Sequence, residues 1–288
     1  MRKALIAVAI MVVVLAVIVG IVGVWQWASS LKRIQPLFSQ PICETTTEYQ
    51  RAELSIEQSQ NAVIITSIAA ERGLAPRAVS IALTTAFQES KILNLDYGDR
   101  DSLGLFQQRP SQGWGTPEQI MDPYYSTGKF YDAMVNVKDW ESADIGDVAQ
   151  AVQRSGFPDA YDKHVSRARL LASALSGQTP ASWSCLVVDP VPADPDQLLD
   201  AMTLGFGSTI ETNLTSVTDS TPAQITIEAT SEAVAWSSAA FAQSWASLTG
   251  VSGVRVGTLQ WQASATEMAP WIDDPTSQAP ATTVVISF

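Results

Sequence analysis

Histidine is nearly absent from this sequence, and cysteine is scarce. The chain has one histidine, His164, and two cysteines. A structural or catalytic zinc site needs several Cys or His ligands at close spacing, and no such cluster exists here. A Ser-His-Asp hydrolase built on His164 would need a nucleophile elbow of the Gly-x-Ser-x-Gly type, which is also missing. We therefore expect neither a metal nor a cofactor, and interpret His164 as an exposed helix residue.

Basic residues are also in short supply. Lysine and arginine together number 17 against 29 acidic residues, which gives a net charge of −12 and an isoelectric point near 4.4. An acidic surface repels phosphate groups, so we do not expect a nucleic-acid partner. The 288 residues are enough for a membrane anchor and two compact domains.

One long stretch, 4–25, lacks any charged residue and follows Met1-Arg2-Lys3. At about 1.5 Å per residue, a helix of this length crosses the roughly 30 Å hydrocarbon core of a bilayer. A cleaved signal peptide is the alternative, but no small-x-small cleavage site follows, and Trp25-Gln26-Trp27 is typical of an interfacial belt. The sequence predicts an uncleaved transmembrane anchor over 1–25. The protein would be a single-pass cell-membrane protein, with its N-terminus inside and everything else outside.

The two cysteines, Cys43 and Cys185, bracket most of the first half of the chain. In an oxidising compartment they are a natural pair. A disulfide closing so long a loop would stabilise the fold by about 4 to 5 kcal/mol on a loop-entropy model. The alternative is two unrelated buried thiols.

The most informative stretch ends in Gln88-Glu89-Ser90, at the end of an apolar helix. Glu89 shares its face with the small residues Ala78, Ala82 and Thr85, so that this face can pack closely against a neighbour. A carboxyl group held there loses hydration, and its pKa rises toward the range of a general acid. Such an acid is what glycosidic bond cleavage requires. The alternative is a solvated surface residue in the last helical turn.

A resemblance to known enzymes rests on this stretch and on Gly104-Leu105-Phe106-Gln107, which follows a polar loop. Together they are similar to the first two motifs of the soluble lytic transglycosylases and the goose-type lysozymes. Gly98-Asp99-Arg100 resembles the Gly-Asp-Arg run of the goose type, and 88–114 resembles a lysozyme-like domain common in actinobacterial surface proteins. The resemblance covers roughly 50–175. It implies that Glu89 is the catalytic acid and that peptidoglycan glycan strands are the substrate.

The resemblance also implies a set of substrate-binding residues. Ala151-Val152-Gln153 lies where the lytic transglycosylases carry Ala-Tyr-Asn, and Tyr161 matches the tyrosine after that motif, so its phenol would form a hydrogen bond near Glu89. Trp114, between two glycines, is a candidate for stacking on sugar rings, although a lid packed on the core fits as well. The predicted substrate-binding residues are Ser90, Gln107, Trp114, Gln153 and Tyr161.

Two reactions on the bond between N-acetylmuramic acid and N-acetylglucosamine remain open. A lytic transglycosylase uses one acid, and the sugar's own 6-hydroxyl group attacks; a goose-type muramidase adds water held by an aspartate, here Asp99, with Asp101 as a substitute. The loop from Glu89 to Gly104 is short for the goose type, which favours the transglycosylase. A glycan-binding scaffold without activity is a further alternative.

The predicted organisation places a linker over 26–50 and a mainly α lysozyme-like domain, with a short β-hairpin at its cleft, over 51–177. A Pro-rich linker without regular structure follows at 178–196. Alternating patterns then predict a small α+β domain over 197–288, with a three-stranded sheet. It shows no catalytic pattern, so a spacer or a protein-binding role is the default.

Overall fold

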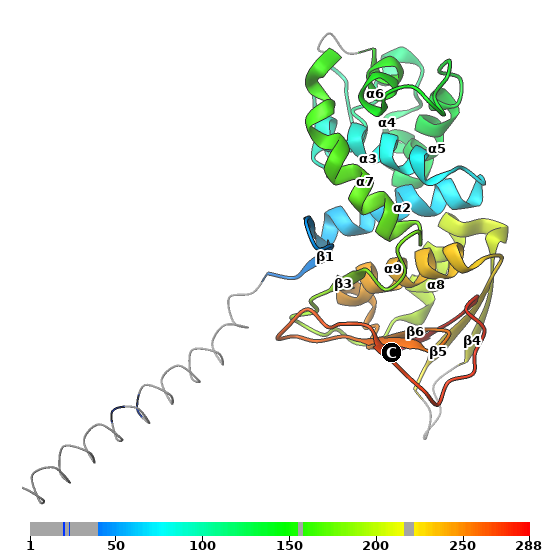
Figure 1. The fold of residues 1–288 in the computed structure, drawn as a ribbon. Coiled ribbons are helices and arrows are strands. Elements are labelled where there is room, and N and C mark those ends of the chain that lie inside the picture. The colour runs from blue at the N-terminus through cyan, green and yellow to red at the C-terminus, as the bar shows by residue number, and fades with distance from the viewer. Residues whose placement is uncertain (1–19, 21–22, 24–39, 155–157, 216–221) are drawn as a thin grey trace, which may run out of the picture. The chain divides into compact units, whose positions relative to one another are not determined.

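A computed structural model describes residues 20, 23, 40–154, 158–215 and 222–288. Pro41–Phe288 form one compact unit (Figure 1). The predicted membrane anchor, 1–25, lies outside the described residues apart from Gly20 and Gly23. Among the helices of the described part, none is long and apolar enough to cross a bilayer. This finding corrects the prediction of a single-pass membrane protein.

The first two helices of the compact unit begin where their sequences indicate. Helix α2, Ile56–Glu71, is capped by Ser55, whose side chain accepts from the Gln58 N–H while the Gln58 side chain accepts from the Ser55 N–H. This is the predicted capping box. Helix α3, Pro76–Ser90, begins with proline at its first turn, where the missing N–H has no cost. It ends at Lys91, whose φ of 60° turns the chain out of the helix.

Shorter helices complete the helical region, defined here as residues 56–175. They are α4 (Pro117–Ile120), α5 (Pro123–Met134), α6 (Ile145–Gln153) and α7 (Asp162–Leu175), with 3₁₀ turns at η2 (Pro110–Gln112) and η3 (Pro158–Ala160). The second predicted capping box, between Thr116 and Gln119, is present at the start of α4. Helix α7 packs along α3, and α6 packs against the same helix.

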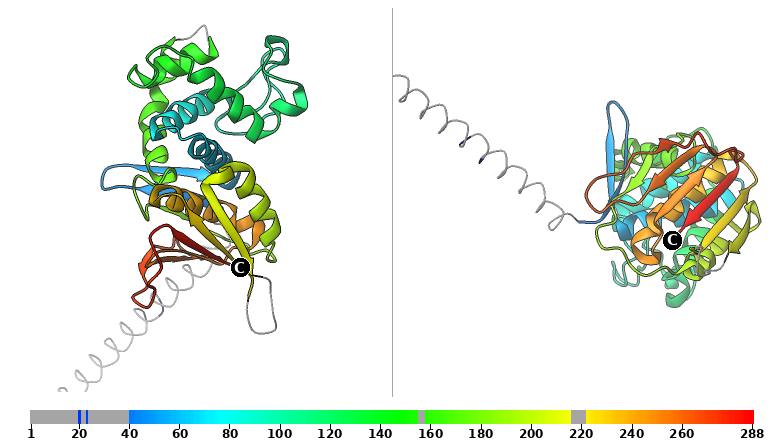
Figure 2. Two further views of the ribbon diagram at one scale, coloured as in Figure 1. Left: turned by 90° about the vertical axis from the view of Figure 1, so that its right-hand side faces the viewer. Right: turned by 90° about the horizontal axis from the view of Figure 1, so that it is seen from below.

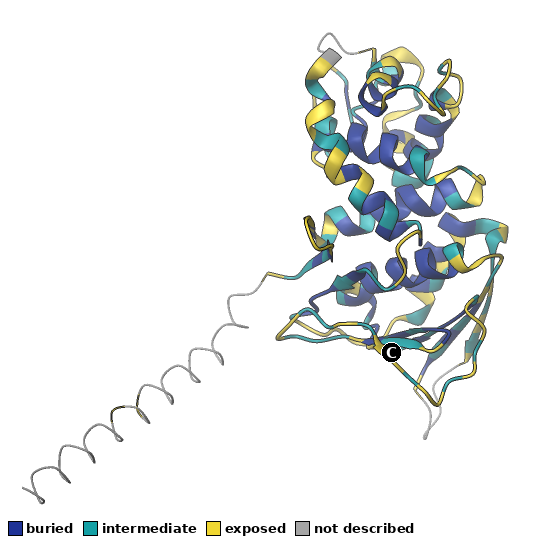
Figure 3. Cartoon of the chain, in the orientation of Figure 1, coloured by how far each residue is buried: buried dark blue, intermediate teal, exposed yellow. Residues whose placement is uncertain are grey.

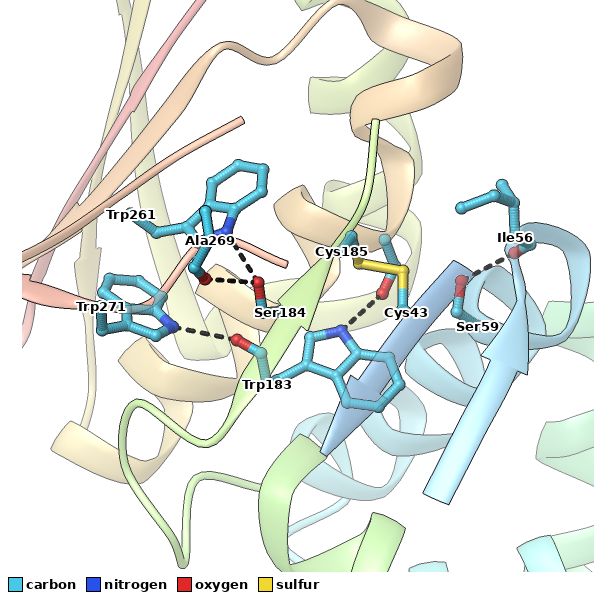
Figure 4. Close-up of a disulfide and its surroundings, with 10 residues drawn as sticks. Cys43, Ile56, Ser59, Trp183, Ser184, Cys185, Trp261, Ala269 and Trp271 are labelled. Carbon is cyan, nitrogen blue, oxygen red and sulfur yellow. Dashed lines mark hydrogen bonds between the residues drawn. A yellow bond between two sulfur atoms is a disulfide. The ribbon is translucent and has the colours of Figure 1, made fainter. Parts of the chain in front are cut away.

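A three-stranded antiparallel sheet, in the order β2-β1-β3, joins segments that are far apart in the sequence. Its strands are β1 (Ile42–Thr46), β2 (Arg51–Ser55) and β3 (Trp183–Cys185). Cys43 lies opposite Cys185 in the β1–β3 ladder, and the predicted disulfide between them is present and buried (Figure 4). The predicted linkers 26–50 and 178–196 therefore contain strands.

Strand β3 is held by tryptophan side chains (Figure 4). The Trp183 indole N–H donates to Ser244 Oγ at 3.1 Å, and the Trp271 indole N–H donates to the Trp183 carbonyl oxygen at 2.9 Å. The Trp261 indole N–H donates to Ser184 Oγ at 3.0 Å. These bonds tie a segment that was expected to be irregular firmly to the C-terminal part of the chain.

The C-terminal part, residues 195–288, is called the sheet region here. Helix α8 (Pro195–Phe206) and the turn η4 (Gly207–Thr209) precede β4, and α9 (Glu232–Thr249) lies between β5 and β6 in the sequence. Its antiparallel sheet has the order β4-β5-β9-β6-β7-β8. The strands are β4 (Ile210–Thr215), β5 (Gln224–Ala229), β6 (Gly253–Val256), β7 (Leu259–Gln262), β8 (Ile272–Asp273) and β9 (Thr283–Ser287).

Helices α8 and α9 lie between this sheet and α2 (Figures 1 and 2). Helix α2 is buried along most of its length because α5 covers it on one side and α9 on the other (Figure 3). Gly205 permits the close approach of α8, since a side chain there would overlap Ser67 of α2. The helical and sheet regions thus share one hydrophobic core.

The fold class predicted from the sequence is wrong. The structure is mixed α/β with two antiparallel sheets, rather than a mainly α domain followed by a small α+β domain. The expected hairpin at the cleft is reduced to an isolated bridge between Leu103 and Gln108, because Gln107 adopts a φ of 47° and closes a tight turn. The expected three-stranded C-terminal sheet has six strands. Short strands such as β3 and β8 carry too few residues for an alternating pattern to be visible.

Candidate active site

Glu89 lies in the last turn of α3, where α7 packs against that helix. The residue before α7 is Tyr161, which is buried, and its hydroxyl donates to Glu89 Oε1 at 2.5 Å. The structure therefore contains the predicted contact between these two side chains, which are 72 residues apart in the sequence. The described residues give Glu89 Oε2 no hydrogen-bond partner, so the Tyr161 hydroxyl engages only one of the two carboxyl oxygens.

The half-buried position of Glu89 has an electrostatic consequence. Burial raises the pKa of this carboxyl group above its ordinary value, because the charged form loses hydration; the hydrogen bond from Tyr161 partly opposes the shift. The protonated form of Glu89 therefore persists to higher pH than in a solvated glutamate. This is the property required of a general acid.

The turn 104–108 is tied to the end of α3, which carries Glu89, and to the end of α6. The Ser90 hydroxyl donates to the Leu105 carbonyl oxygen at 2.7 Å, and the Gln153 amide at the end of α6 donates to the Phe106 carbonyl oxygen at 2.7 Å. Leu105 and Phe106 are fully buried, which anchors the turn in the core. The two consecutive carbonyl groups accept hydrogen bonds from the ends of α3 and α6. The turn, which carries Gln107, is therefore held between these two helix ends.

Gly104 is required at the start of this turn. Its φ is +75°, and an added Cβ would lie 2.8 Å from the Ile120 carbonyl oxygen, so a side chain there is excluded by both conformation and space. Gly98 has a related role, since a side chain there would overlap the Gln107 amide. The Gln107 amide nitrogen donates to the carbonyl oxygens of Tyr97, at 3.2 Å, and Gly104, at 3.3 Å. The two glycines thus leave the space for Gln107, and the hydrogen bonds of its amide hold the side chain in place.

A cleft of about 540 Å³ opens beside the turn. Three segments form it: the loop after Gln107, the end of α5 with the turn that follows, and the end of α6. Its lining combines amide groups, two arginines and apolar side chains: Gln107, Arg109, Gln112, Trp114, Ala133, Asn136, Val137, Ala151, Val152, Gln153 and Arg154. Amide groups and a half-exposed indole are suited to sugar hydroxyl groups and ring faces.

The structure places the predicted substrate-binding residues at different depths. Gln107, Trp114 and Gln153 line the cleft. Tyr161 and Glu89 are not among the lining residues; their pair is connected to the cleft through Ser90, which follows Glu89 and binds the turn 104–108 that carries Gln107. Ser90 is buried, and its hydroxyl is used to hold Leu105, so this side chain positions the turn.

Asp99 does not approach Glu89 through any contact that the described residues show. Its side chain is 91% exposed, and its carboxylate lies 3.8 Å from Arg100. The substitute, Asp101, accepts from the Ser111 N–H at 2.8 Å and pairs with Arg109 at 2.7 Å. The contacts with Ser111 and then with Arg109 hold the pKa of Asp101 well below its usual range. Asp101 therefore shapes the loop.

His164 is half-buried on α7, which differs from the expected exposed position. Its ring stacks on Phe87, and Nε2 lies 3.3 Å from Gln88 Oε1. Burial, aided by the neighbouring Lys163 and Arg167, lowers the pKa of His164. His164 thus packs against the helix that carries Glu89.

Sequence reasoning missed several cleft residues, among them Arg109, Gln112, Asn136 and Arg154. Arg109 and Arg154 directly follow the Gln-containing motifs, so their positions in the sequence were a usable signal. Asn136 had none, because the turn after α5 is brought to the cleft only by tertiary packing.

No protein-family model matches this chain, and a sequence comparison with characterised proteins finds no match.

Proposed function

We propose that this chain is a peptidoglycan-cleaving enzyme that acts on the β-1,4 bond between N-acetylmuramic acid and N-acetylglucosamine as a lytic transglycosylase. The observation that carries the proposal is the half-buried Glu89, hydrogen-bonded by Tyr161 at 2.5 Å, at the end of a helix that Ser90 ties to the turn whose Gln107 lines an amide-rich cleft. The resemblance of the Glu-Ser and Gly-x-x-Gln motifs to those enzymes supports the same reading.

In this mechanism the protonated Glu89 gives its proton to the bridging oxygen as the glycosidic bond breaks, and positive charge develops at the ring carbon. The resulting carboxylate then takes the proton of the 6-hydroxyl group of the same sugar, whose oxygen attacks that carbon. A 1,6-anhydro ring closes, no water is consumed, and Glu89 is protonated again. Tyr161 holds Oε1 throughout, which directs Oε2 to the reacting atoms.

One carboxyl group is sufficient for this reaction. The two influences on the pKa of Glu89 are burial and the Tyr161 hydroxyl, and neither is a second carboxylate. Asp99, which the hydrolytic alternative requires, projects into solvent. These observations favour the transglycosylase over a goose-type muramidase.

The test is mass spectrometry of the soluble fragments that the full-length protein releases from purified peptidoglycan. We expect fragments ending in 1,6-anhydro-N-acetylmuramic acid. Glu89→Gln should lower the release rate roughly 10²- to 10⁴-fold, because it removes the proton donor while keeping the shape. Glu48→Gln, an exposed glutamate in the turn between β1 and β2, is the matched control and should retain the wild-type rate.

Other products would change the conclusion. Reducing-end fragments would identify a hydrolase, and Asp99→Asn would become the next variant. Binding to peptidoglycan without release of any fragment, in wild type as in Glu89→Gln, would favour the scaffold alternative.

A further inference from the structure

The cleft has the opposite charge to the protein as a whole. The chain carries 29 acidic residues and 17 basic ones, yet the described lining of the cleft contains two arginines and no acidic residue. A cation within a concave site, where low-dielectric walls displace water, attracts anions more strongly than one on an open surface. The cleft is therefore suited to an anionic ligand despite the acidic surface around it.

The two arginines of the cleft differ in how their charge is used. Arg109 donates from Nε to Asp101 Oδ1 at 2.7 Å, and it also donates to Ser111 Oγ at 3.3 Å. Its charge is thus neutralised inside the loop. Arg154 is exposed, and among the residues that the structure describes it has neither an ion pair nor a side-chain hydrogen bond. Arg154 is the cation that remains available to a ligand.

Arg154 also occupies an unusual backbone position. It ends α6 in the left-handed conformation, with φ of 51° and ψ of 37°, a place where glycine is the unstrained choice. The side chain obtains no buried packing in return, since it is exposed. The preceding residue, Gln153, is fixed to the Phe106 carbonyl oxygen at 2.7 Å, so the base of Arg154 is held firmly at the cleft.

We propose that Arg154 binds a carboxylate of the substrate, so that the cleft selects anionic glycan strands over neutral ones. This inference rests on the proposed function. A guanidinium group pairs with a carboxylate through two parallel hydrogen bonds, which gives direction as well as attraction. Peptidoglycan offers two sources of this group: the stem peptides, and the lactyl groups that become free carboxylates when the stems are removed.

The experiment measures binding of soluble glycan fragments to full-length Glu89→Gln, in which the fragments survive. Fragments with stems and fragments stripped of stems are each used as prepared and after amidation of their carboxylates. We expect amidation to weaken binding about tenfold or more for at least one type, which identifies the source of the carboxylate. Adding Arg154→Gln should abolish this discrimination. Arg169→Gln, an exposed arginine that lines a separate hollow with Asp144, should leave it intact.

Arg154→Gly provides a second variant that is compatible with the backbone, so that poor folding of Arg154→Gln would not decide the question. Equal binding of native and amidated fragments, no binding of any form, or discrimination that survives both Arg154 variants would overturn the inference. Cleavage by the wild type without charge discrimination would refute the role of Arg154 and leave the proposed function standing. Charge-dependent binding through Arg154 without any cleavage would refute the proposed function and leave the binding site standing.

Discussion

Two carboxyl groups, one in each region of the molecule, are shifted in opposite directions. In the helical region, burial raises the pKa of Glu89. In the sheet region, the hydrogen bonds from Thr276 hold the pKa of Asp274 below its ordinary value, and Arg255 adds a smaller effect. Asp274 is an acid whose charged form is satisfied, whereas Glu89 is an acid whose charged form is penalised.

The direction of the pKa shift distinguishes a carboxyl group that stabilises the fold from one that is suited to catalysis. A structural acid gains partners that stabilise the fold, while a catalytic acid is kept in a state that costs stability. The polar groups of the helical region also converge on one cleft, from three separate segments.

The disulfide should contribute most to stability, because it connects β1 to β3 across 142 residues and thus closes the whole helical region into one loop. Replacing Cys43 and Cys185 together by alanine should lower the free energy of unfolding by about 4 to 5 kcal/mol, as the unfolded chain gains freedom. Urea unfolding followed by circular dichroism measures the change. A loss below about 1 kcal/mol would show that tertiary packing, and not the cross-link, holds the two regions together.

A matched pair of core phenylalanines separates stability from activity. Phe106 and Phe241 are both fully buried; Phe106 stacks on Phe130 in the helical region, and Phe241 on Trp245 in the sheet region. Either alanine variant should lose about 3 to 5 kcal/mol of unfolding free energy. At temperatures where both remain folded, Phe106→Ala alone should reduce fragment release, because the turn 104–108 loses its anchor. Equal activity losses would remove the functional contrast between the regions.

The opposite pKa shifts predict opposite dependences of stability on pH. Glu89 has a raised folded pKa, so its ionisation costs stability at pH values above the unfolded pKa of about 4.3. The stability of Glu89→Gln relative to wild type should therefore rise as the pH increases from the unfolded pKa of Glu89 to its folded pKa. Asp274 has a lowered folded pKa, so its contribution is present above the unfolded pKa of about 3.9 and is lost as pH falls through the folded value. Asp274→Asn should thus be less stable than wild type at neutral pH and converge with it in acid.

Urea midpoints of the three proteins, taken between acidic and neutral pH, check both signs. If the urea midpoints of Glu89→Gln and wild type differ by the same amount at every pH, Glu89 has an ordinary pKa. The proposed role of Glu89 as a general acid then loses its main support.

The smallest effect concerns two residues in the left-handed conformation, Arg154 in the helical region and Ala181 in the segment before β3, with φ of 51° and 56°. Glycine at either position should stabilise the fold by about 1 kcal/mol, because the conformation is strained for other residues. Thermal unfolding measures this gain. Only Arg154→Gly should weaken glycan binding, and a similar loss in Ala181→Gly would show that the effect is not specific to the guanidinium group.

The sequence by itself determined the features that depend on neighbours along the chain. The capping box at Ser55, the proline start of α3 at Pro76 and the capping box at Thr116 are set by hydrogen bonds and backbone restrictions within a few residues. The sequence limited the disulfide to one possibility, because two cysteines can form only one bond within a chain, and the structure contains that bond. Glu89 could be selected as a candidate because it lies in the last turn of an apolar helix.

Packing between residues distant in the sequence set most of the remaining features. The β1–β3 ladder pairs segments that the sequence predicted to be linkers, and the six-stranded sheet adds β4 and β8 to strands that alternating patterns did predict. The contact of Tyr161 with Glu89 and the position of Arg154 at the cleft arise because α7 and α6 pack on α3. Local patterns encode the preferences of the backbone, but burial, which sets the pKa of Glu89, is created only when the helices meet.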